Sequence, residues 1–345
     1  MNFHSVVLLL WAGLLSGTAV ADPRISFDLN TGKAGQNVSF LSPLSGWSPL
    51  RMSEISSGNY QISVVRPWNP DLPYKFQVNG KTLLDPANPV HVSDGSGGQA
   101  SLRKTGFQED PLLQPKAGVP ALERTDLQIR DPQGQDRTIT VYSPTQSVSR
   151  GTRTATIYFL DGDAYLSWTG VLNLLPNLAS LKKMPFVTAV FIAPKNRDTE
   201  YVMSEPYSDW MSTQVVPLVE SKFNTGGDAD HRLLIGASLS GLQSVYTAVR
   251  NPSVFGMAGS QSGSFWEQNG AVLKFLPGAA GHHLNFYLDV GTYESARMLE
   301  YTRQTYNLSI KEHFTAVTTS FPGTHDITCW RNRLQMILLH FFSGR

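Results

Sequence analysis

The sequence is poor in cysteine and has almost no excess of charge. Cys329 is the single cysteine in 345 residues, which excludes a disulfide within the chain and a zinc site built from cysteines. Lys and Arg number 28 and Asp and Glu number 27, so the net charge is +1. We expect no nucleic-acid partner, because sequence-independent binding to phosphates requires an excess of basic residues. Hydrophobic residues make up 41% of the chain, which excludes wholesale disorder.

Long apolar runs are also scarce. The run from Val6 to Leu15 has ten residues and is followed by small residues that end in Ala19-Val20-Ala21. This pattern predicts a secretory signal over residues 1–21, and the run is too short to span a bilayer. We therefore expect an exported protein without a stable membrane anchor, located in the periplasm or secreted. A buried N-terminal helix or an uncleaved anchor is the alternative.

Residues 22–104 contain short β-like runs separated by turn formers, which predicts a small all-β sandwich domain. Asn79-Gly80 favours a tight hairpin turn, because both residues accept a positive φ. The predicted strands are Asn37 to Leu41, Tyr60 to Val65 and Tyr74 to Val78. Residues 105–121 are rich in Pro, Gly and Gln and are predicted to form a linker.

Residues 122–345 alternate apolar strands with helical stretches, which predicts an α/β domain with a mostly parallel central sheet. In such a sheet ligands bind beyond the carboxyl ends of the strands. The predicted strands are Arg137 to Tyr142, Thr154 to Leu160, Phe186 to Ile192, Arg232 to Gly236, Phe286 to Val290 and Phe314 to Thr318. The predicted helices are Ser208 to Phe223, Leu239 to Arg250 and Ser295 to Tyr306.

A serine stands between one predicted strand and the following helix, in the run Gly236-Ala-Ser238-Leu-Ser240-Gly241. A serine on such a sharp turn exposes its hydroxyl above the sheet, where it can act as a nucleophile. The usual pattern is G-x-S-x-G, and Ser240 stands at the position of the second glycine. Serine is small, so we expect the turn to tolerate it. The alternative is that Ser238 is an ordinary helix-capping serine.

A nucleophilic serine needs a base, and the base needs an acid that orients it. α/β-Hydrolases carry these residues in the order serine, acid, histidine, and Glu294 and His325 follow Ser238 in that order. Glu294 lies just beyond the strand ending at Val290, and His325 lies in a turn. Asp289, inside the same strand, is the competing acid, and Asp326 is expected to orient its own loop.

The oxyanion of the tetrahedral intermediate needs two backbone donors. One is expected to be the N–H of Leu239, directly after the serine. The other is expected to be the N–H of Asp163, with Gly162 as the alternative, because Gly162 permits an unusual turn after the strand that ends at Leu160. This chemistry is two-step acyl transfer, and it requires no metal and no organic cofactor.

Residues 122–342 resemble the enterochelin (enterobactin) esterases, in the esterase-D-like branch of the α/β-hydrolases. The matching blocks are Phe159 to Asp163, Gly236 to Gly241, Ser260 to Trp266, Leu288 to Glu294 and Gly323 to Arg331. The resemblance implies Ser238 as nucleophile, His325 as general base and Glu294 as the acid. The N-terminal part is similar both to the N-terminal domain of these esterases and to the immunoglobulin-like glycogen-binding modules that precede xylan-active esterases. The resemblance therefore implies an immunoglobulin-like domain over residues 22–104.

Three functions stay open for this sequence. The first is hydrolysis of a ferric catecholate siderophore, an enterobactin-like trilactone, in the periplasm. The second is a carbohydrate esterase that removes feruloyl or acetyl groups, as on xylan, and the third is a non-catalytic ligand-binding protein on a hydrolase scaffold. The residues expected to contact a small-molecule ester are Arg197, Trp168 and Trp266. Arg197 resembles a family position that faces the anionic substrate. An open cleft lined by Trp47 or Trp68 would favour a glycan.

Overall fold

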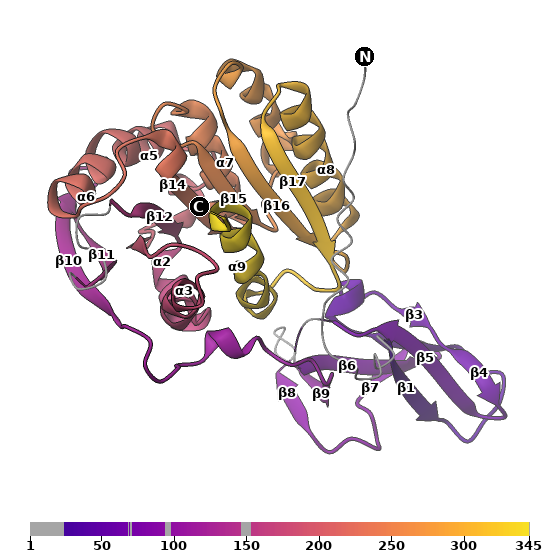
Figure 1. Cartoon of the computed structure of the whole chain (residues 1–345). Helices are drawn as coiled ribbons and strands as arrows, with labels where there is room; N and C mark the ends of the chain where they lie inside the picture. Colours follow the sequence, from indigo (N-terminus) through magenta and orange to yellow (C-terminus); the bar gives the residue numbers. More distant parts are fainter. Residues whose placement is uncertain (1–23, 68, 70, 94–97, 146–152, 345) are drawn as a thin grey trace, which may run out of the picture.

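The computed structural model describes residues 24–67, 69, 71–93, 98–145 and 153–344 (Figure 1). The predicted signal, residues 1–21, and Trp68 lie outside this part of the chain. Within the described residues, no helix is both long and apolar enough to cross a membrane.

The N-terminal strands form two antiparallel sheets. The first has the order β1 (Arg24–Asn30), β5 (Asn59–Val65) and β4 (Ser53–Ser56). The second has the order β3 (Leu50–Arg51), β2 (Val38–Leu41), β6 (Asp71–Val78), β9 (Gln99–Lys104) and β8 (His91–Ser93), with β7 (Lys81–Leu83) paired to β6. Phe27, Phe40 and Tyr74 pack together in the core of this region.

The three strands predicted here are confirmed as β2, β5 and β6. The predicted hairpin is confirmed as well, since β6 pairs with β7 across Asn79 and Gly80, whose φ angles are 48° and 84°. An all-β N-terminal region agrees with these elements. The immunoglobulin-like assignment and the domain limits stay predictions.

An eight-stranded sheet organises the rest of the chain. Its order is β10 (Leu122–Arg130), β11 (Asp136–Pro144), β13 (Val187–Ile192), β12 (Ala155–Leu160), β14 (Arg232–Ala237), β15 (Met257–Gln261), β16 (Asn285–Gly291) and β17 (Thr315–Phe321). The strands from β13 to β17 along this order are parallel, and β10 and β11 are antiparallel additions at one edge. The predicted mostly parallel sheet is therefore confirmed.

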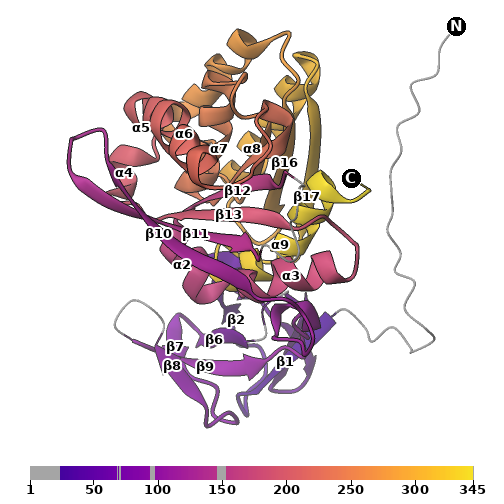
Figure 2. The ribbon, with the colours of Figure 1, turned by 60° about the vertical axis from the view of Figure 1, so that its left-hand side comes forward.

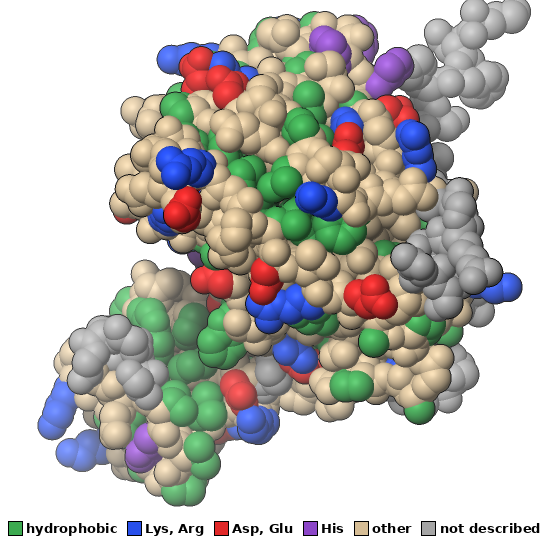
Figure 3. All heavy atoms as spheres, turned by 90° about the vertical axis from the view of Figure 1, so that its left-hand side faces the viewer, with side chains coloured by type: hydrophobic (Ala, Val, Ile, Leu, Met, Phe, Trp, Pro, Cys, Tyr) green, Lys and Arg blue, Asp and Glu red, His purple; other side chains and the backbone are tan. Residues whose placement is uncertain are grey.

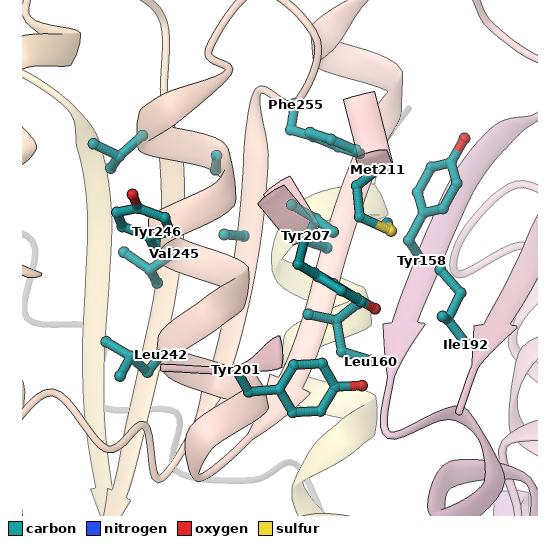
Figure 4. Close-up of a cluster of buried hydrophobic side chains, with 14 of the residues drawn as sticks. Tyr158, Leu160, Ile192, Tyr201, Tyr207, Met211, Leu242, Val245, Tyr246 and Phe255 are labelled. Carbon is teal, nitrogen blue, oxygen red and sulfur yellow. The ribbon is translucent and has the colours of Figure 1, made fainter. Parts of the chain in front are cut away.

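Helices cover both faces of this sheet, as expected when strands are apolar on both sides (Figure 2). One face packs against α2 (Gly162–Trp168), α3 (Val171–Ser180) and α9 (Ile327–Phe342). The other packs against α5 (Glu205–Trp210), α6 (Val216–Lys222), α7 (Leu239–Arg250) and α8 (Ala296–Lys311). Tyr158 and Leu160 of β12 belong to the second face (Figure 4), whereas Ile157 and Phe159 belong to the first.

Several elements depart from the sequence prediction. The helix predicted over 208–223 is α5 and α6 joined by a π-helical turn, Met211–Val215. Strand β15 was not predicted, because its sequence Met-Ala-Gly-Ser-Gln lacks β-branched and aromatic residues. Strand β10 was also missed, since most of its side chains are exposed at the edge of the sheet.

The N-terminal strands lie against the loops at the carboxyl end of the large sheet (Figure 1). Asn69 makes two side-chain contacts across this junction: its amide Nδ2 donates to Asp326 Oδ2 at 2.8 Å, and its Oδ1 accepts from Cys329 Sγ at 2.9 Å. The Tyr293 hydroxyl donates to the Val65 carbonyl at 2.7 Å. These contacts anchor the N-terminal sheets beside the loops that follow β16 and β17.

Replacing Asn69 with alanine should lower the free energy of unfolding by about 1–3 kcal/mol, because two partly buried partners lose their hydrogen bonds. Urea denaturation followed by fluorescence measures this change. Asn59→Ala is the control, since the Asn59 amide bonds only to its own turn, at Ser56 and Ser57. Equal destabilisation by the two changes would contradict the junction described here.

Candidate active site

Ser238 occupies the sharp turn between β14 and α7, with φ 60° and ψ −121°. Such a positive φ is costly for a residue with a side chain and persists only where the surroundings hold it. The turn is tight because a Cβ on Gly236 would lie 2.3 Å from the Ser240 carbonyl oxygen. The Ser238 backbone is held by Gln261, whose carbonyl accepts its N–H at 2.9 Å.

His325 links the serine hydroxyl to a carboxylate. Its Nε2 lies 2.9 Å from Ser238 Oγ, and its Nδ1 lies 2.8 Å from Glu294 Oε2. The histidine belongs to the turn between β17 and α9, and the Trp330 ring packs perpendicular to it at a centroid distance of 5.1 Å. The structure thus brings the three residues predicted as nucleophile, base and acid into one hydrogen-bonded chain.

Glu294 is held so that one oxygen faces the histidine. Its other oxygen, Oε1, accepts the Gly291 N–H at 2.8 Å and the Ser262 hydroxyl at 2.6 Å. The side chain is only 1% exposed, which keeps water from competing for the imidazole. Gly291 and Gly323 allow the two loops to meet, since a Cβ on Gly291 would lie 2.2 Å from the Gly323 carbonyl oxygen.

The two other carboxylates considered for the acid have different partners. Asp289 is fully buried in β16, accepts the Ser262 N–H and faces Arg333 at 3.6 Å. Burial raises the pKa of Asp289 to about 6, against the opposing effect of Arg333. Asp326 caps α9 by accepting the N–H groups of residues 328 and 329.

The two backbone N–H groups expected to bind the oxyanion lie in the first turns of two helices, α7 and α2. Leu239 is the first residue of α7 and Asp163 lies in the first turn of α2, where N–H groups have no partner inside the helix. Asp163 lines the same cavity as Ser238 and His325. We expected Gly162 to provide the unusual backbone turn after β12, and this is wrong. The residue with the positive φ, 56°, is Asp161. Gly162 is required because a Cβ there would lie 2.3 Å from the Ile192 nitrogen.

Arg197 lines this cavity, but its charge is already matched. Its Nε and Nη2 donate to the two carboxylate oxygens of Asp161 at 2.8 and 2.9 Å. The side chain of Arg197 is 43% exposed and that of Asp161 is 12% exposed. The carboxylate of Asp161 therefore compensates the charge of the guanidinium, and the expectation that Arg197 faces an anionic substrate stays a prediction.

Two cavities meet at Ser238 and His325. The larger, about 810 Å³, lies between the N-terminal strands and the large sheet, and Trp47 and Trp266 line it. The smaller, about 500 Å³, is lined by Arg197 and Trp168. Trp168 is 62% exposed at the end of α2. The two tryptophans predicted to contact substrate thus lie in different cavities, on either side of the serine.

Charge around the site is mixed. Arg297 packs over the Trp266 ring at 4.9 Å in the larger cavity, whose wall also includes Asp71 and Glu294. On the face drawn in Figure 3, Lys and Arg are interspersed with Asp and Glu rather than gathered in one patch. Across the described residues, no three His, Cys, Asp or Glu side chains are placed to hold a metal ion.

Three residues that contact the catalytic side chains were not predicted from the sequence. Ser262 and Ser264 follow β15, and Trp330 is in the first turn of α9. Trp330 Nε1 donates to Ser262 Oγ at 3.0 Å, and Ser264 Oγ lies 3.2 Å from Ser238 Oγ. The quoted block from Ser260 to Trp266 contains both serines, and recognising β15 would have placed them at a strand end.

The fold and the site together define an α/β-hydrolase with a serine, a histidine and a carboxylate in one hydrogen-bonded chain. The family model described as "Putative esterase" matches residues 132–341, more than half of the chain. The protein belongs to this esterase family and is a carboxylic ester hydrolase, which sets aside the non-catalytic alternative.

Two curated proteins share 28% of their residues with this chain in the matched region. The uncharacterized protein YbbA of Bacillus subtilis matches over 204 residues, which are 51% of this chain and 79% of that protein. The iron(III) enterobactin esterase of Escherichia coli K12 matches over 198 residues, 53% of this chain and 48% of that enzyme. The match therefore spans about half the length of the enterobactin esterase.

Solved structures extend the likeness of the fold. The enterobactin esterase from Shigella flexneri, determined in the presence of enterobactin, has a TM-score of 0.67 at 20% identity and covers 94% of both chains. A ferulic acid esterase from Anaeromyces mucronatus, in complex with ferulic acid, has a TM-score of 0.57 at 15% identity. That alignment covers 67% of this chain and 95% of the esterase.

Ser238→Ala should lower kcat on an aryl ester by at least about 10⁴-fold, because the attacking oxygen is lost. The fold should stay intact, since the turn is held through backbone groups. Spectrophotometric assays with 4-nitrophenyl butyrate and circular dichroism measure the two effects. Turnover by the folded variant at the wild-type rate would exclude Ser238 as the nucleophile.

Glu294→Gln should lower kcat by about 10²- to 10⁴-fold, because a carboxamide cannot stabilise the imidazolium and favours the wrong tautomer. Asp289→Asn is the matched control and should keep kcat within a few-fold of wild type, since Asp289 has no contact with His325. The same assay decides between them. A larger loss in kcat for Asp289→Asn than for Glu294→Gln would assign the orienting role to Asp289.

Proposed function

We propose that the protein is an exported serine esterase that hydrolyses the ester bonds of a catecholate siderophore, an enterobactin-like trilactone, in the periplasm. The observation that carries this proposal is the larger cavity, one wall of which comes from the N-terminal strands. Enterobactin esterases of known structure resemble this chain over both regions, whereas the ferulic acid esterase aligns with about two thirds of it.

In the proposed mechanism, His325 Nε2 takes the proton from Ser238 Oγ as that oxygen attacks the ester carbonyl. The N–H groups of Leu239 and Asp163 hold the oxyanion, and Glu294 stabilises the imidazolium. His325 then gives its proton to the leaving alkoxide, which departs as the alcohol. A water molecule, deprotonated by His325, attacks the acyl-enzyme. His325 then returns that proton to Ser238 Oγ as the acid product leaves.

The two cavities suit an ester that is bulky on both sides of the scissile bond. Trp47, Trp266 and Tyr293 give the larger cavity aromatic surfaces on which planar catechol rings can stack. Arg297, packed over Trp266, adds a positive charge at that wall for an anionic catecholate. A trilactone presents three equivalent esters, so each can enter the junction of the cavities in turn.

A feruloyl or acetyl carbohydrate esterase is the second candidate. It is favoured by one observation, the ion pair between Arg197 and Asp161, which leaves the smaller cavity without an uncompensated cation for a catecholate. The exposed Trp168 ring in that cavity suits a sugar or a feruloyl ring equally well.

Ferric enterobactin and methyl ferulate, assayed in parallel by chromatography of the products, separate the two candidates. We expect kcat/KM for ferric enterobactin to exceed that for methyl ferulate by at least about 100-fold, because only the larger ligand fills both cavities. Ser238→Ala is the blank for both substrates. Preference for methyl ferulate would overturn the siderophore proposal in favour of the carbohydrate esterase.

Trp47→Ala tests the N-terminal wall separately. It should raise KM for ferric enterobactin and leave the turnover of 4-nitrophenyl butyrate unchanged, since that small ester does not reach Trp47. An equal effect on both esters would mean that Trp47 acts on the fold and not on the substrate.

A further inference from the structure

Ser240, at the second glycine position of the turn pattern, has a fully buried hydroxyl with defined partners. Its Oγ accepts the Ala237 N–H at 2.8 Å and lies 2.7 Å from Asp161 Oδ2 and 2.8 Å from the Ala237 carbonyl. The hydroxyl has one proton to donate, and the carboxylate is the stronger acceptor. Ser240 therefore connects the serine turn to Asp161, a residue 79 positions earlier in the chain.

Asp161 is held at every polar group. Its carboxylate binds Arg197 through both oxygens and takes the Ser240 hydroxyl, its N–H donates to the Tyr201 hydroxyl at 3.0 Å, and its carbonyl accepts the Tyr165 N–H at 3.1 Å. Tyr201 lies beside Leu160 at the end of β12 (Figure 4). These bonds fix a residue whose backbone is left-handed, with φ 56° and ψ 43°.

The left-handed turn at Asp161 decides where α2 begins, and with it the position of the Asp163 N–H. This left-handed conformation is uncommon for a residue with a side chain and persists where the surroundings enforce it. Here the enforcement comes from Arg197 on one side and from Ser240 on the other. Strands β12 and β14 are parallel neighbours, with Phe159 beside Ile235, so the two turns leave the sheet next to each other.

We propose that Ser240, Asp161 and Arg197 are positioning residues that hold the two backbone donors of the oxyanion hole at a fixed separation. Ser240 is one residue from the Leu239 N–H, and Asp161 is two residues from the Asp163 N–H. A shift of the Asp161 turn relative to the serine turn would separate the donors without moving Ser238 from His325. The inference rests on the proposed function, in which these N–H groups stabilise the oxyanion.

The test compares Ser240→Ala and Ser240→Gly with Ser244→Ala in the full-length protein. Ser244 is also fully buried on α7, one turn later, and its hydroxyl bonds only to the Ser240 carbonyl. Both Ser240 variants should lower kcat for 4-nitrophenyl butyrate by about 10- to 100-fold, with KM within about twofold, because an oxyanion contact acts mainly in the transition state. Ser244→Ala should stay near wild type.

Two further measurements distinguish positioning from a general loss of structure. Titration of active sites with paraoxon gives the concentration of reactive serine. Expressing kcat per reactive serine removes the effect of any misfolded fraction on the measured rate. Inhibition by phenylboronic acid, whose adduct on Ser238 mimics the tetrahedral intermediate, should weaken in the Ser240 variants by a factor similar to the loss in kcat. A loss in thermal stability with unchanged kcat per site and unchanged boronate affinity would overturn the proposal.

Arg197→Gln tests the opposite end of the hydrogen-bonded series Ser240–Asp161–Arg197. It should lower kcat with little change in KM, and the double variant with Ser240→Ala should lose less than the product of the two single losses, since both act through Asp161. Multiplicative losses would show that they act independently and contradict the inference. Wild-type protein inactive on 4-nitrophenyl butyrate, or active Ser238→Ala, would instead overturn the proposed function itself.

Discussion

The close contact between the backbones of Gly291 and Gly323 is the constraint on which the active site depends. The two glycines stand where neighbouring parallel strands, β16 and β17, end, and their backbones meet with no room for a side chain on Gly291. A side chain on Gly323 would collide with Phe321 and Cys329. The contact between the two glycines brings Glu294 within reach of His325. The loop bonds reinforce it, because the Tyr293 N–H donates to the Gly323 carbonyl at 3.1 Å. A bulkier residue at Gly291 would separate the acid from the base before it changed any reacting group.

Order at the site comes mainly from polar groups that have fixed partners. Glu294, Asp289 and Asp161 are all largely buried, and each is bound by a different set of donors: the histidine loop, the arginine of α9 and the arginine of α4 (Arg197–Glu200). A buried carboxylate without such donors would be protonated or would move. Their donors give each carboxylate a single orientation, and of the three only Glu294 contacts the imidazole.

The reacting residues could be predicted from the sequence because their signals are local. Ser238 follows a strand and precedes a helix, and Glu294 and His325 follow strands in the chain order of this fold class. The partners of these residues were beyond such reasoning. Ser262 contacts Glu294 across 32 positions, and Ser240 contacts Asp161 across 79. The ion pair between Arg197 and Asp161 was beyond it for the same reason, since a sequence does not show which carboxylate lies beside an arginine.

The N-terminal strands are joined to the catalytic loops at the residue next to the base. Asp326 caps α9 through one oxygen and accepts the Asn69 amide through the other, so the cap that fixes the histidine turn also fixes the N-terminal region. Cys329, buried in the first turn of α9, completes the contact through its thiol. A small movement of the N-terminal wall would therefore displace both the rim of the larger cavity and the turn that carries His325. This coupling explains why a region that contributes none of the reacting side chains is bonded so closely to the site.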